Sequence, residues 1–165
     1  MKELHLKELN KVIVKDEIEE LIHAYVQCID GDHLEEWPEF FTEDCLYQII
    51  SRENYEQNLP ASIIYCDSKG MLKDRVTAHR QANIFEKHVY RHIVSSIRIT
   101  NQEEDVYTVY TNYAVFQTRL NGYSEVYNVG KYIDTIVFEN GQAKFKEKKV
   151  VYDSLVIPTL LVTPI

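Results

Sequence analysis

Two Asn-Gly dipeptides, Asn121-Gly122 and Asn140-Gly141, stand between long runs of apolar and β-branched residues in the second half of the chain. Both residues of such a pair accept positive φ, so Asn-Gly between apolar runs strongly favours a tight β-hairpin. The polar stretch Asn101-Gln102-Glu103-Glu104 separates an earlier run from the next. The sequence therefore predicts an antiparallel meander of four long strands, at residues 90–100, 106–120, 123–138 and 143–152.

The first half of the chain carries helical periodicity instead. One apolar face at i, i+3, i+4 and i+7 spacing predicts a helix over residues 16–29, ended by Gly31, and consists of Ile18, Leu21, Ile22, Tyr25, Val26 and Ile29. Further helices are predicted at 33–41 and 71–85, short strands at 45–50 and 63–66, and a loop at 53–60. Helices followed by a long curved sheet predict an α+β, cone-like fold.

The strand predicted at 106–120 is apolar on both faces. Val106, Tyr110, Ala114 and Phe116 point one way, whereas Tyr107, Val109, Tyr113 and Val115 point the other. The helices of one domain can cover only one face of a meander, so we expect another chain to cover the second. The alternative is a face lined with half-exposed aromatic residues.

Composition narrows the class of protein. The 165 residues are 45% hydrophobic, which suits a single domain, residues 1–165, with a sizeable core. A formal net charge of -8 argues against nucleic-acid binding, and we expect the cluster Lys144, Lys146, Lys148 and Lys149 to be the solvated face of a strand. Neither a signal peptide nor a membrane-spanning run of roughly 20 apolar residues is expected. Three widely spaced cysteines predict core residues in a reduced, cytoplasmic setting.

Motifs for metal or cofactor chemistry are missing from the sequence. It contains no Cys-x-His or Cys-x-x-His pair, no GxGxxG, no P-loop and no GxSxG. His88 and His92 are four residues apart, a spacing that presents two imidazoles only on a helix, and His92 begins a predicted strand. We therefore expect no metal and no cofactor in this chain.

One group of polar side chains could form a pocket inside the cone: Tyr25, Asp30, Tyr47, His79 and His92. A histidine oriented by an aspartate, with tyrosine donors nearby, suits proton abstraction beside a carbonyl. The alternative is purely structural, with Asp30 capping a turn and His92 bonding within the sheet. An open, polar cavity around an Asp30–imidazole contact would favour a stand-alone isomerase, dehydratase or cyclase; a filled, dry cone would favour a scaffold.

Three segments carry a family resemblance. Arg91-His92-Ile93-Val94-Ser95-Ser96-Ile97-Arg98 resembles the Arg-His-x-Val-Ser-x-x-Arg stretch of the beta subunits of aromatic-ring-hydroxylating dioxygenases. Trp37, followed by Phe41-Thr42-Glu43-Asp44-Cys45-Leu46-Tyr47, and the end from Tyr152 to Ile165 are similar to two further segments of that family. Residues 67–76 look most like the branch of salicylate hydroxylases, terephthalate dioxygenases and halobenzoate dioxygenases.

The resemblance implies the cystatin-like cone shared with nuclear transport factor 2, ketosteroid isomerase and scytalone dehydratase. It further implies that the chain contributes no catalytic residue and joins a larger alpha subunit, usually as an alpha-three, beta-three hexamer. The alpha subunit would hold the Rieske 2Fe–2S cluster and the mononuclear iron and largely set the aromatic substrate, and a reductase would deliver electrons from NADH. Residues expected at subunit contacts, among them those of a beta trimer, are Arg91, Arg98, Asp153, Ile157, Pro158 and Leu161.

Overall fold

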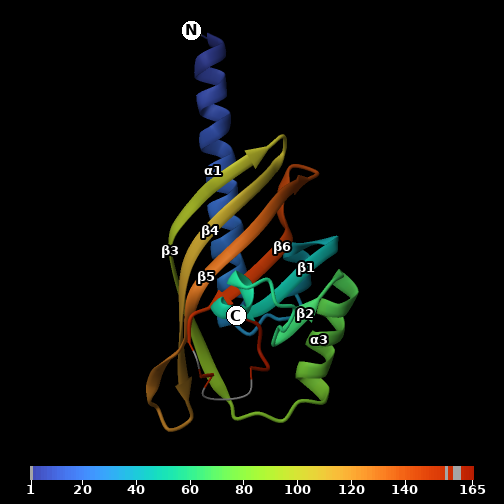
Figure 1. The fold of residues 1–165 in the computed structure, drawn as a ribbon, viewed down its shortest axis with the longest axis vertical. Coiled ribbons are helices and arrows are strands. Elements are labelled where there is room, and N and C mark those ends of the chain that lie inside the picture. Colours follow the sequence, from blue (N-terminus) through green and yellow to red (C-terminus); the bar gives the residue numbers. More distant parts are fainter. Residues whose placement is uncertain (1, 155, 158–160) are drawn as a thin grey trace.

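A six-stranded curved sheet dominates the computed structural model, which describes residues 2–154, 156–157 and 161–165, with side chains from residue 8 onward (Figure 1). The strand order is β2-β1-β6-β5-β4-β3. The strands are β1 (Phe41–Ser51), β2 (Ile64–Cys66), β3 (His88–Glu103), β4 (Val106–Arg119), β5 (Ser124–Glu139) and β6 (Gln142–Tyr152). The α+β fold and the antiparallel meander β3–β6 are confirmed.

The sheet is mixed rather than wholly antiparallel. β1 pairs with β6 in parallel, with Ile49 opposite Val150, whereas its other neighbour, β2, runs antiparallel to it. A parallel pair needs a long crossover between its strands. Here that crossover contains two helices, β2 and the strands β3 to β5, a separation along the chain that no local sequence pattern reveals.

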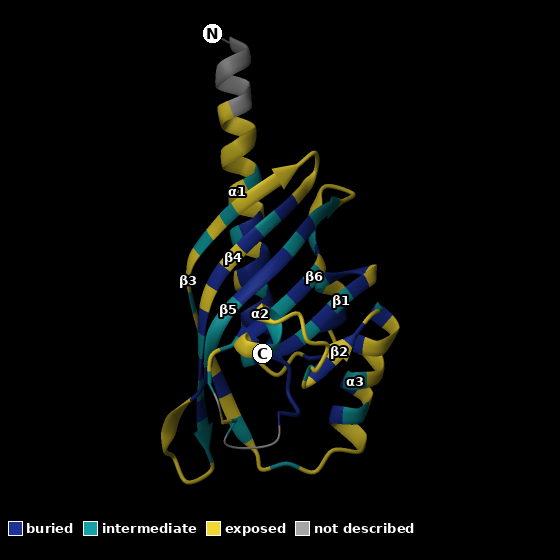
Figure 2. Cartoon of the chain, in the orientation of Figure 1, coloured by how far each residue is buried: buried dark blue, intermediate teal, exposed yellow. Residues whose placement is uncertain are grey.

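The long helix α1 (Lys2–Asp30) lies along one face of the sheet and passes behind the strands in Figure 1. All six residues of its predicted apolar face are buried, so that prediction is confirmed. The helix starts earlier than predicted, and residues 8–13 are exposed (Figure 2). It ends at Asp30, close to the predicted end. The residue with the left-handed backbone conformation after the helix is Asp32, with φ 58°, and not Gly31 as predicted.

Three local predictions were wrong in detail. The helix predicted at 33–41 is only the 3-10 turn η1 (Trp37–Phe40). The first residues of the loop predicted at 53–60 belong to a short helix, α2 (Arg52–Glu56). The Ser51 hydroxyl, which accepts the Asn54 N–H, caps α2, and such caps favour a helix start. The third helix, α3 (Lys69–Gln81), ends earlier than predicted, and Ile84 beyond it is 96% exposed.

Bulges bend the strands around the helix. The register shifts between Ser95 and Arg98 in β3, where Ser96 has φ 55°. It shifts again in β5, where Tyr127 is the extra residue between Val126, which pairs with Phe116, and Asn128, which pairs with Val115. A bulge inserts an extra residue and increases the local bend of its strand. The sheet can therefore close over α1, and the core lies between its concave face and the helix (Figure 2).

Both Asn-Gly pairs join neighbouring strands as predicted, but only Asn140-Gly141 has positive φ at both residues. Asn140 and Gly141, between β5 and β6, have φ 51° and 80°, as a primed hairpin turn requires. Gly122, between β4 and β5, has φ 82°. Among the described residues, no helix is long and apolar enough to cross a membrane.

Candidate functional site

The predicted contact between Asp30 and His92 is present inside the cone. Asp30 ends α1 and His92 lies on β3, and their Oδ1 and Nδ1 atoms are 2.6 Å apart. The second carboxylate oxygen accepts the His92 backbone N–H at 2.8 Å. Because a carboxylate only accepts, Nδ1 carries the proton, and Nε2 of a neutral imidazole is left as an acceptor. That Nε2 is buried and has no hydrogen-bond partner among the described residues.

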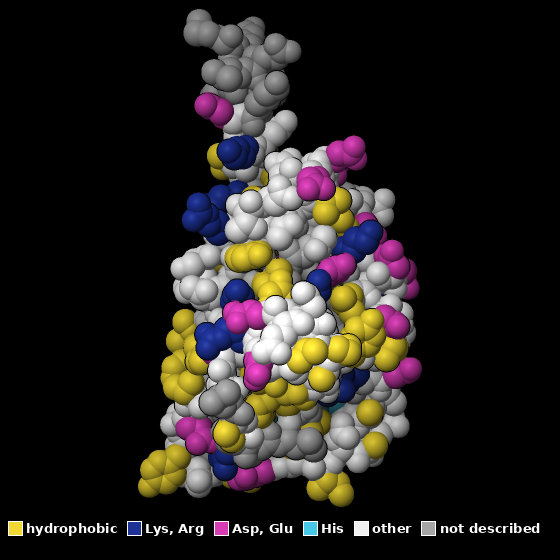
Figure 3. Space-filling view, in the orientation of Figure 1, with side chains coloured by type: hydrophobic (Ala, Val, Ile, Leu, Met, Phe, Trp, Pro, Cys, Tyr) yellow, Lys and Arg dark blue, Asp and Glu magenta, His cyan; other side chains and the backbone are white. Residues whose placement is uncertain are grey.

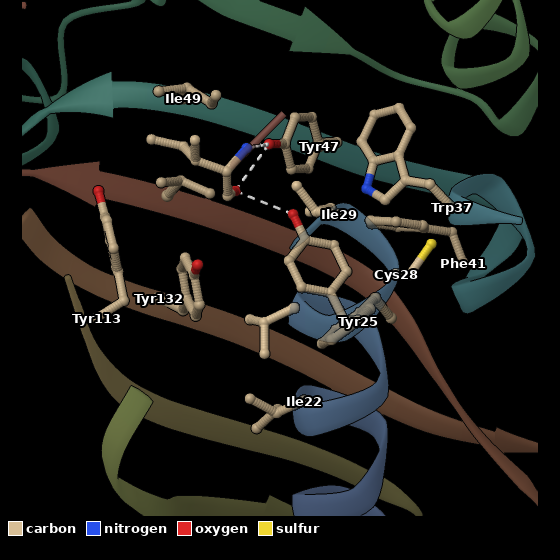
Figure 4. Close-up of a cluster of buried hydrophobic side chains, with 14 of the residues drawn as sticks. Ile22, Tyr25, Cys28, Ile29, Trp37, Phe41, Tyr47, Ile49, Tyr113 and Tyr132 are labelled. Atoms are coloured by element: carbon tan, nitrogen blue, oxygen red, sulfur yellow. Dashed lines mark hydrogen bonds between the residues drawn. The ribbon is translucent and has the colours of Figure 1, made fainter. Parts of the chain in front are cut away.

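The other members of the predicted group bind a different part of the chain. The hydroxyls of Tyr25, on α1, and Tyr47, on β1, both donate to the main-chain oxygen of Ile165, at 2.9 and 3.0 Å (Figure 4). His79, on α3, has its Nε2 2.9 Å from the Thr163 hydroxyl. Segment 161–165 therefore fills the space between these side chains.

Burial favours the uncharged forms of Tyr25, Tyr47 and His79. Desolvation raises the pKa of Tyr25 and Tyr47 well above that of an exposed tyrosine, so neither is poised to ionise. Burial, the largest cause, also lowers the pKa of His79, and the Arg80 guanidinium beside it lowers that pKa further. These side chains act here as neutral hydrogen-bonding groups.

A surface cavity of about 710 Å³ opens at the mouth of the cone. Asp30, His79, His88, Arg119 and Thr163 are among the residues that line it, but His92 is not. The Asp30–His92 pair thus has the predicted geometry, while its imidazole faces a filled interior instead of an open pocket. Of the two outcomes weighed from the sequence, a filled cone is the one observed, and a stand-alone isomerase is not favoured.

A buried ion pair, which the sequence did not predict, joins β5 to β6. Lys148 was predicted on a solvated strand face, but it is 0% exposed and its Nζ lies 3.0 Å from Oδ2 of Asp134, also 0% exposed. The reason is a bulge: Glu147 pairs with Thr135 while Phe145 pairs with Ile136, so β6 has one extra residue and its alternation reverses. The ammonium also lies 3.7 Å from the centroid of the Tyr132 ring, which suits a cation–π contact.

The described residues contain no group of three or more His, Cys, Asp or Glu side chains placed to hold a metal ion. Cys28, Cys45 and Cys66 are free and buried, as predicted for core residues. Burial is the largest cause that raises the pKa of Cys28 to about 12 and that of Cys45 to about 11, so both thiols stay protonated. The side chains that the structure describes therefore offer no cluster of ligands for an iron centre or an iron–sulfur cluster.

The sheet face opposite α1 exposes apolar side chains around one arginine. Val89 and Ile93 on β3 and Val126 on β5 are 54%, 55% and 56% exposed. Arg91 pairs across β3 and β4 with Phe116, which pairs in turn with Val126. We call these five residues the outer patch. Figure 3 views this side of the molecule, with hydrophobic side chains gathered over the strands between charged ones.

The remaining residues expected at subunit contacts lie in different surroundings. Arg98 is exposed beside α1, and Asp153 is exposed and forms an ion pair with Arg52, 3.3 Å apart. Ile157 packs partly buried against the core, and Leu161 is buried within it. Pro158 lies outside the described residues.

Comparisons with known proteins agree on one family. The profile of the ring hydroxylating beta subunit matches residues 25–159. The chain is 46% identical to the anthranilate 1,2-dioxygenase small subunit of Burkholderia cepacia, over 90% of this chain and 92% of that protein. It is 37% identical to a terephthalate 1,2-dioxygenase terminal oxygenase beta subunit of a Comamonas species, over 86% and 92%.

A solved structure extends the match to three dimensions. A chain assigned as the beta subunit of an aromatic-ring-hydroxylating dioxygenase from Novosphingobium aromaticivorans superposes with a TM-score of 0.87 at 45% identity. The match covers 94% of this chain and 99% of that one. The sequence motifs, the fold and the relatives thus all indicate the same family. The chain belongs to the small (beta) subunits of aromatic-ring-hydroxylating dioxygenases.

Proposed function

We propose that this chain is a single-domain, non-catalytic scaffold that holds an iron-bearing alpha subunit in an assembly able to hydroxylate aromatic acids. The observation that carries the proposal is the outer patch, an apolar surface on a sheet face that α1 does not cover. Exposed apolar side chains gathered on one face mark interaction sites, and arginine at the centre of such a patch is typical of interface anchors.

Arg91 has the surroundings of an interface anchor. It is exposed, and no hydrogen bond or ion pair joins its guanidinium to the described residues, whereas Phe116 pairs with it across the strands. A guanidinium free of internal partners can donate several hydrogen bonds to a carboxylate or carbonyl on another chain. Further contacts with the neighbouring chain would come from Arg98, Asp153 and Ile157.

Iron chemistry in this proposal belongs to the partner. The alpha subunit would hold the Rieske 2Fe–2S cluster and the mononuclear iron, and a reductase would supply electrons from NADH. The lack of a metal-binding cluster among the described residues is compatible with that division. We further propose an alpha-three, beta-three hexamer built on a beta trimer, and a cytoplasmic location, which the three free cysteines support.

The substrate proposal rests on the relatives. Two of them are named for anthranilate and terephthalate, both aromatic acids, at 46% and 37% identity. We therefore propose an aromatic carboxylic acid as the substrate of the assembled enzyme, with the alpha subunit making the contacts to it. In this scheme the beta subunit's own task is to keep alpha subunits in a fixed relative position.

Co-expression with its alpha subunit tests the scaffold role. Light scattering should give the mass of a hexamer, and the complex with a reductase should oxidise NADH when anthranilate is added. Arg91→Glu should weaken association at least about tenfold, because it places a carboxylate in an interface built for a cation. Lys146→Glu, an exposed charge reversal on β6, is the matched control. Association unchanged by Arg91→Glu would remove the outer patch from the interface.

A further inference from the structure

The pair Asp30–His92 is attached to the edge strand that carries Arg91. β3 is the last strand in the sheet order, and among the described residues β4 is its only strand neighbour. Backbone groups of an edge strand that do not bond to a neighbouring strand need other partners. At His92 this partner is a side chain, because the backbone N–H donates to Oδ2 of Asp30 at 2.8 Å. The end of α1 therefore holds β3 at this position.

One carboxylate fixes both the main chain and the ring of His92. While Oδ2 of Asp30 accepts the backbone N–H, Oδ1 lies 2.6 Å from the ring Nδ1. The side chains of His92 and Asp30 are 0% and 8% exposed. Hydrogen bonds to a carboxylate are stronger than those between neutral groups, and burial shields them from water. The pair thus holds the backbone and the side chain of one residue at once.

The place of Asp30 in its helix is by itself unfavourable for a negative charge. Asp30 is the last residue of α1, where the helix dipole carries partial negative charge. The cavity at the mouth of the cone is not lined by His92, so the imidazole serves no ligand there. A carboxylate kept in such a place is explained by what its two hydrogen bonds hold, which is β3.

Arg91 lies between two residues that are anchored inside the cone. Successive side chains of a strand point to opposite faces, so Tyr90 and His92 point inward and Arg91 points outward. Tyr90 is 4% exposed, and its ring centroid lies 5.3 Å from that of Tyr127 and 6.1 Å from that of His92. The backbone on both sides of Arg91 is thus fixed from within, and this sets the direction in which the guanidinium leaves the sheet.

We propose that Asp30 and His92 are positioning residues for Arg91, and that they hold β3 so that its guanidinium meets the partner chain in one orientation. The inference rests on the proposed scaffold function, because it takes Arg91 as an anchor of the interface with the alpha subunit. A group that is already oriented loses less freedom on binding. The pair therefore strengthens association without touching the partner.

A double-mutant cycle tests this role, with calorimetric titration of the purified alpha subunit with the full-length chain. Arg91→Ala should weaken association about tenfold, as the loss of an interface anchor does. Asp30→Asn should weaken it about two- to tenfold, because an amide offers one acceptor atom where the carboxylate offers two. In the Arg91→Ala chain, Asp30→Asn should change association no further, since no anchor remains to be positioned.

Two substitutions of His92 separate positioning from a general effect on folding. His92→Leu should weaken association as Asp30→Asn does, whereas His92→Asn should restore it, because its amide N–H can replace Nδ1 as the donor to Asp30. The matched control is Arg80→Ala, which removes ion pairs with Asp32 and Glu35 just beyond α1 and should leave association unchanged. Circular dichroism checks that each variant is folded, and the His92 variants decide the test if Asp30→Asn does not fold.

Three results would overturn the inference. An equal loss from Asp30→Asn with and without Arg91 would show that the pair acts on the fold in general and not through the guanidinium. Association unchanged by Asp30→Asn and by His92→Leu, with Arg91→Ala still weakening it, would remove the positioning role and leave the proposed function intact. Association unchanged by Arg91→Ala would remove the anchor itself, and with it both the outer patch and its positioning.

Discussion

Removal of one partner from the buried ion pair between Lys148 and Asp134 should destabilise the fold strongly. Lys148→Ala leaves the Asp134 carboxylate 0% exposed and without its partner. Removing one member of a buried pair costs about 3–5 kcal/mol, because the remaining charge stays buried alone. The lost contact with the Tyr132 ring, 3.7 Å from the ammonium, adds to that cost. A loss of this size is a large part of the roughly 5–15 kcal/mol that stabilises a domain.

Urea denaturation followed by circular dichroism measures the loss as a change in the free energy of unfolding. The matched control is Lys149→Ala, on the next residue of the same strand. Lys149 pairs with Glu147 at 3.0 Å, but both side chains are partly exposed, so this variant should lose less than about 1 kcal/mol. The double variant Asp134→Leu with Lys148→Met should recover most of the loss, since no buried charge remains.

The loss caused by Lys148→Ala should also depend on pH. Burial raises the pKa of Asp134 to about 6 although the Lys148 ammonium opposes the shift, so this pKa rises further when lysine is removed. Below about pH 6 the Asp134 carboxyl is neutral in the folded state of both the parent and the variant, so the pH-dependent part of the loss is smallest there. As the pH rises above about 6, this carboxyl ionises beside Lys148 in the parent but stays neutral in the variant, so the loss grows by up to about 1.4 kcal/mol per pH unit.

Equal effects of Lys148→Ala and Lys149→Ala would refute the reasoning. That result would mean that the alternation of inward and outward side chains along β6 does not reverse at the bulge. Lys148 would then face solvent, as the sequence predicted. A loss independent of pH between 4 and 8 would show that the Asp134 carboxylate is not the charge left behind.

Two further stability predictions follow from backbone packing and surface charge. Gly130→Ala places a Cβ 2.1 Å from the Val151 carbonyl oxygen, and only a movement of the backbone can relieve this clash, so the variant should lose about 3 kcal/mol of unfolding free energy in urea denaturation. Gly70→Ala in α3, where the added Cβ would meet Ser68 Oγ at an ordinary 3.9 Å, should stabilise the fold by about 0.5–1 kcal/mol. Hydrogen bonding to Arg80 lowers the pKa of Glu35 to about 2, so this pair stabilises the fold above about pH 4.5 and loses its effect as the pH falls toward 2. Arg80→Ala should therefore cost under about 1 kcal/mol at pH 7 and less at pH 2.5; a larger loss at low pH would contradict the assignment.

Local patterns in the sequence determined most of the secondary structure. The helical spacing from Ile18 to Ile29 and the turn chemistry of Asn140-Gly141 depend only on neighbouring residues, and both appear in the fold as predicted. The family resemblance around Arg91 and His92 is equally local, and the family itself is confirmed by the matching profile and by a relative at 46% identity. The contact between Asp30 and His92 was one of two alternatives that the sequence left open, and the structure shows that it forms.

Tertiary structure alone decided which of these residues are accessible. The bulge in β6 turns Lys148 inward, and only pairing with β5 shows where the extra residue falls. Segment 161–165 returns to Tyr25 across 140 positions of sequence, so no periodicity could predict that it fills the cone. The parallel pairing of β1 with β6 is likewise a long-range contact. The alternation of side chains along a strand and the type of a turn depend on short-range sterics between neighbouring residues, so the sequence predicts them. The burial of a side chain depends on which distant segments of the chain pack over it, so only the tertiary structure shows it.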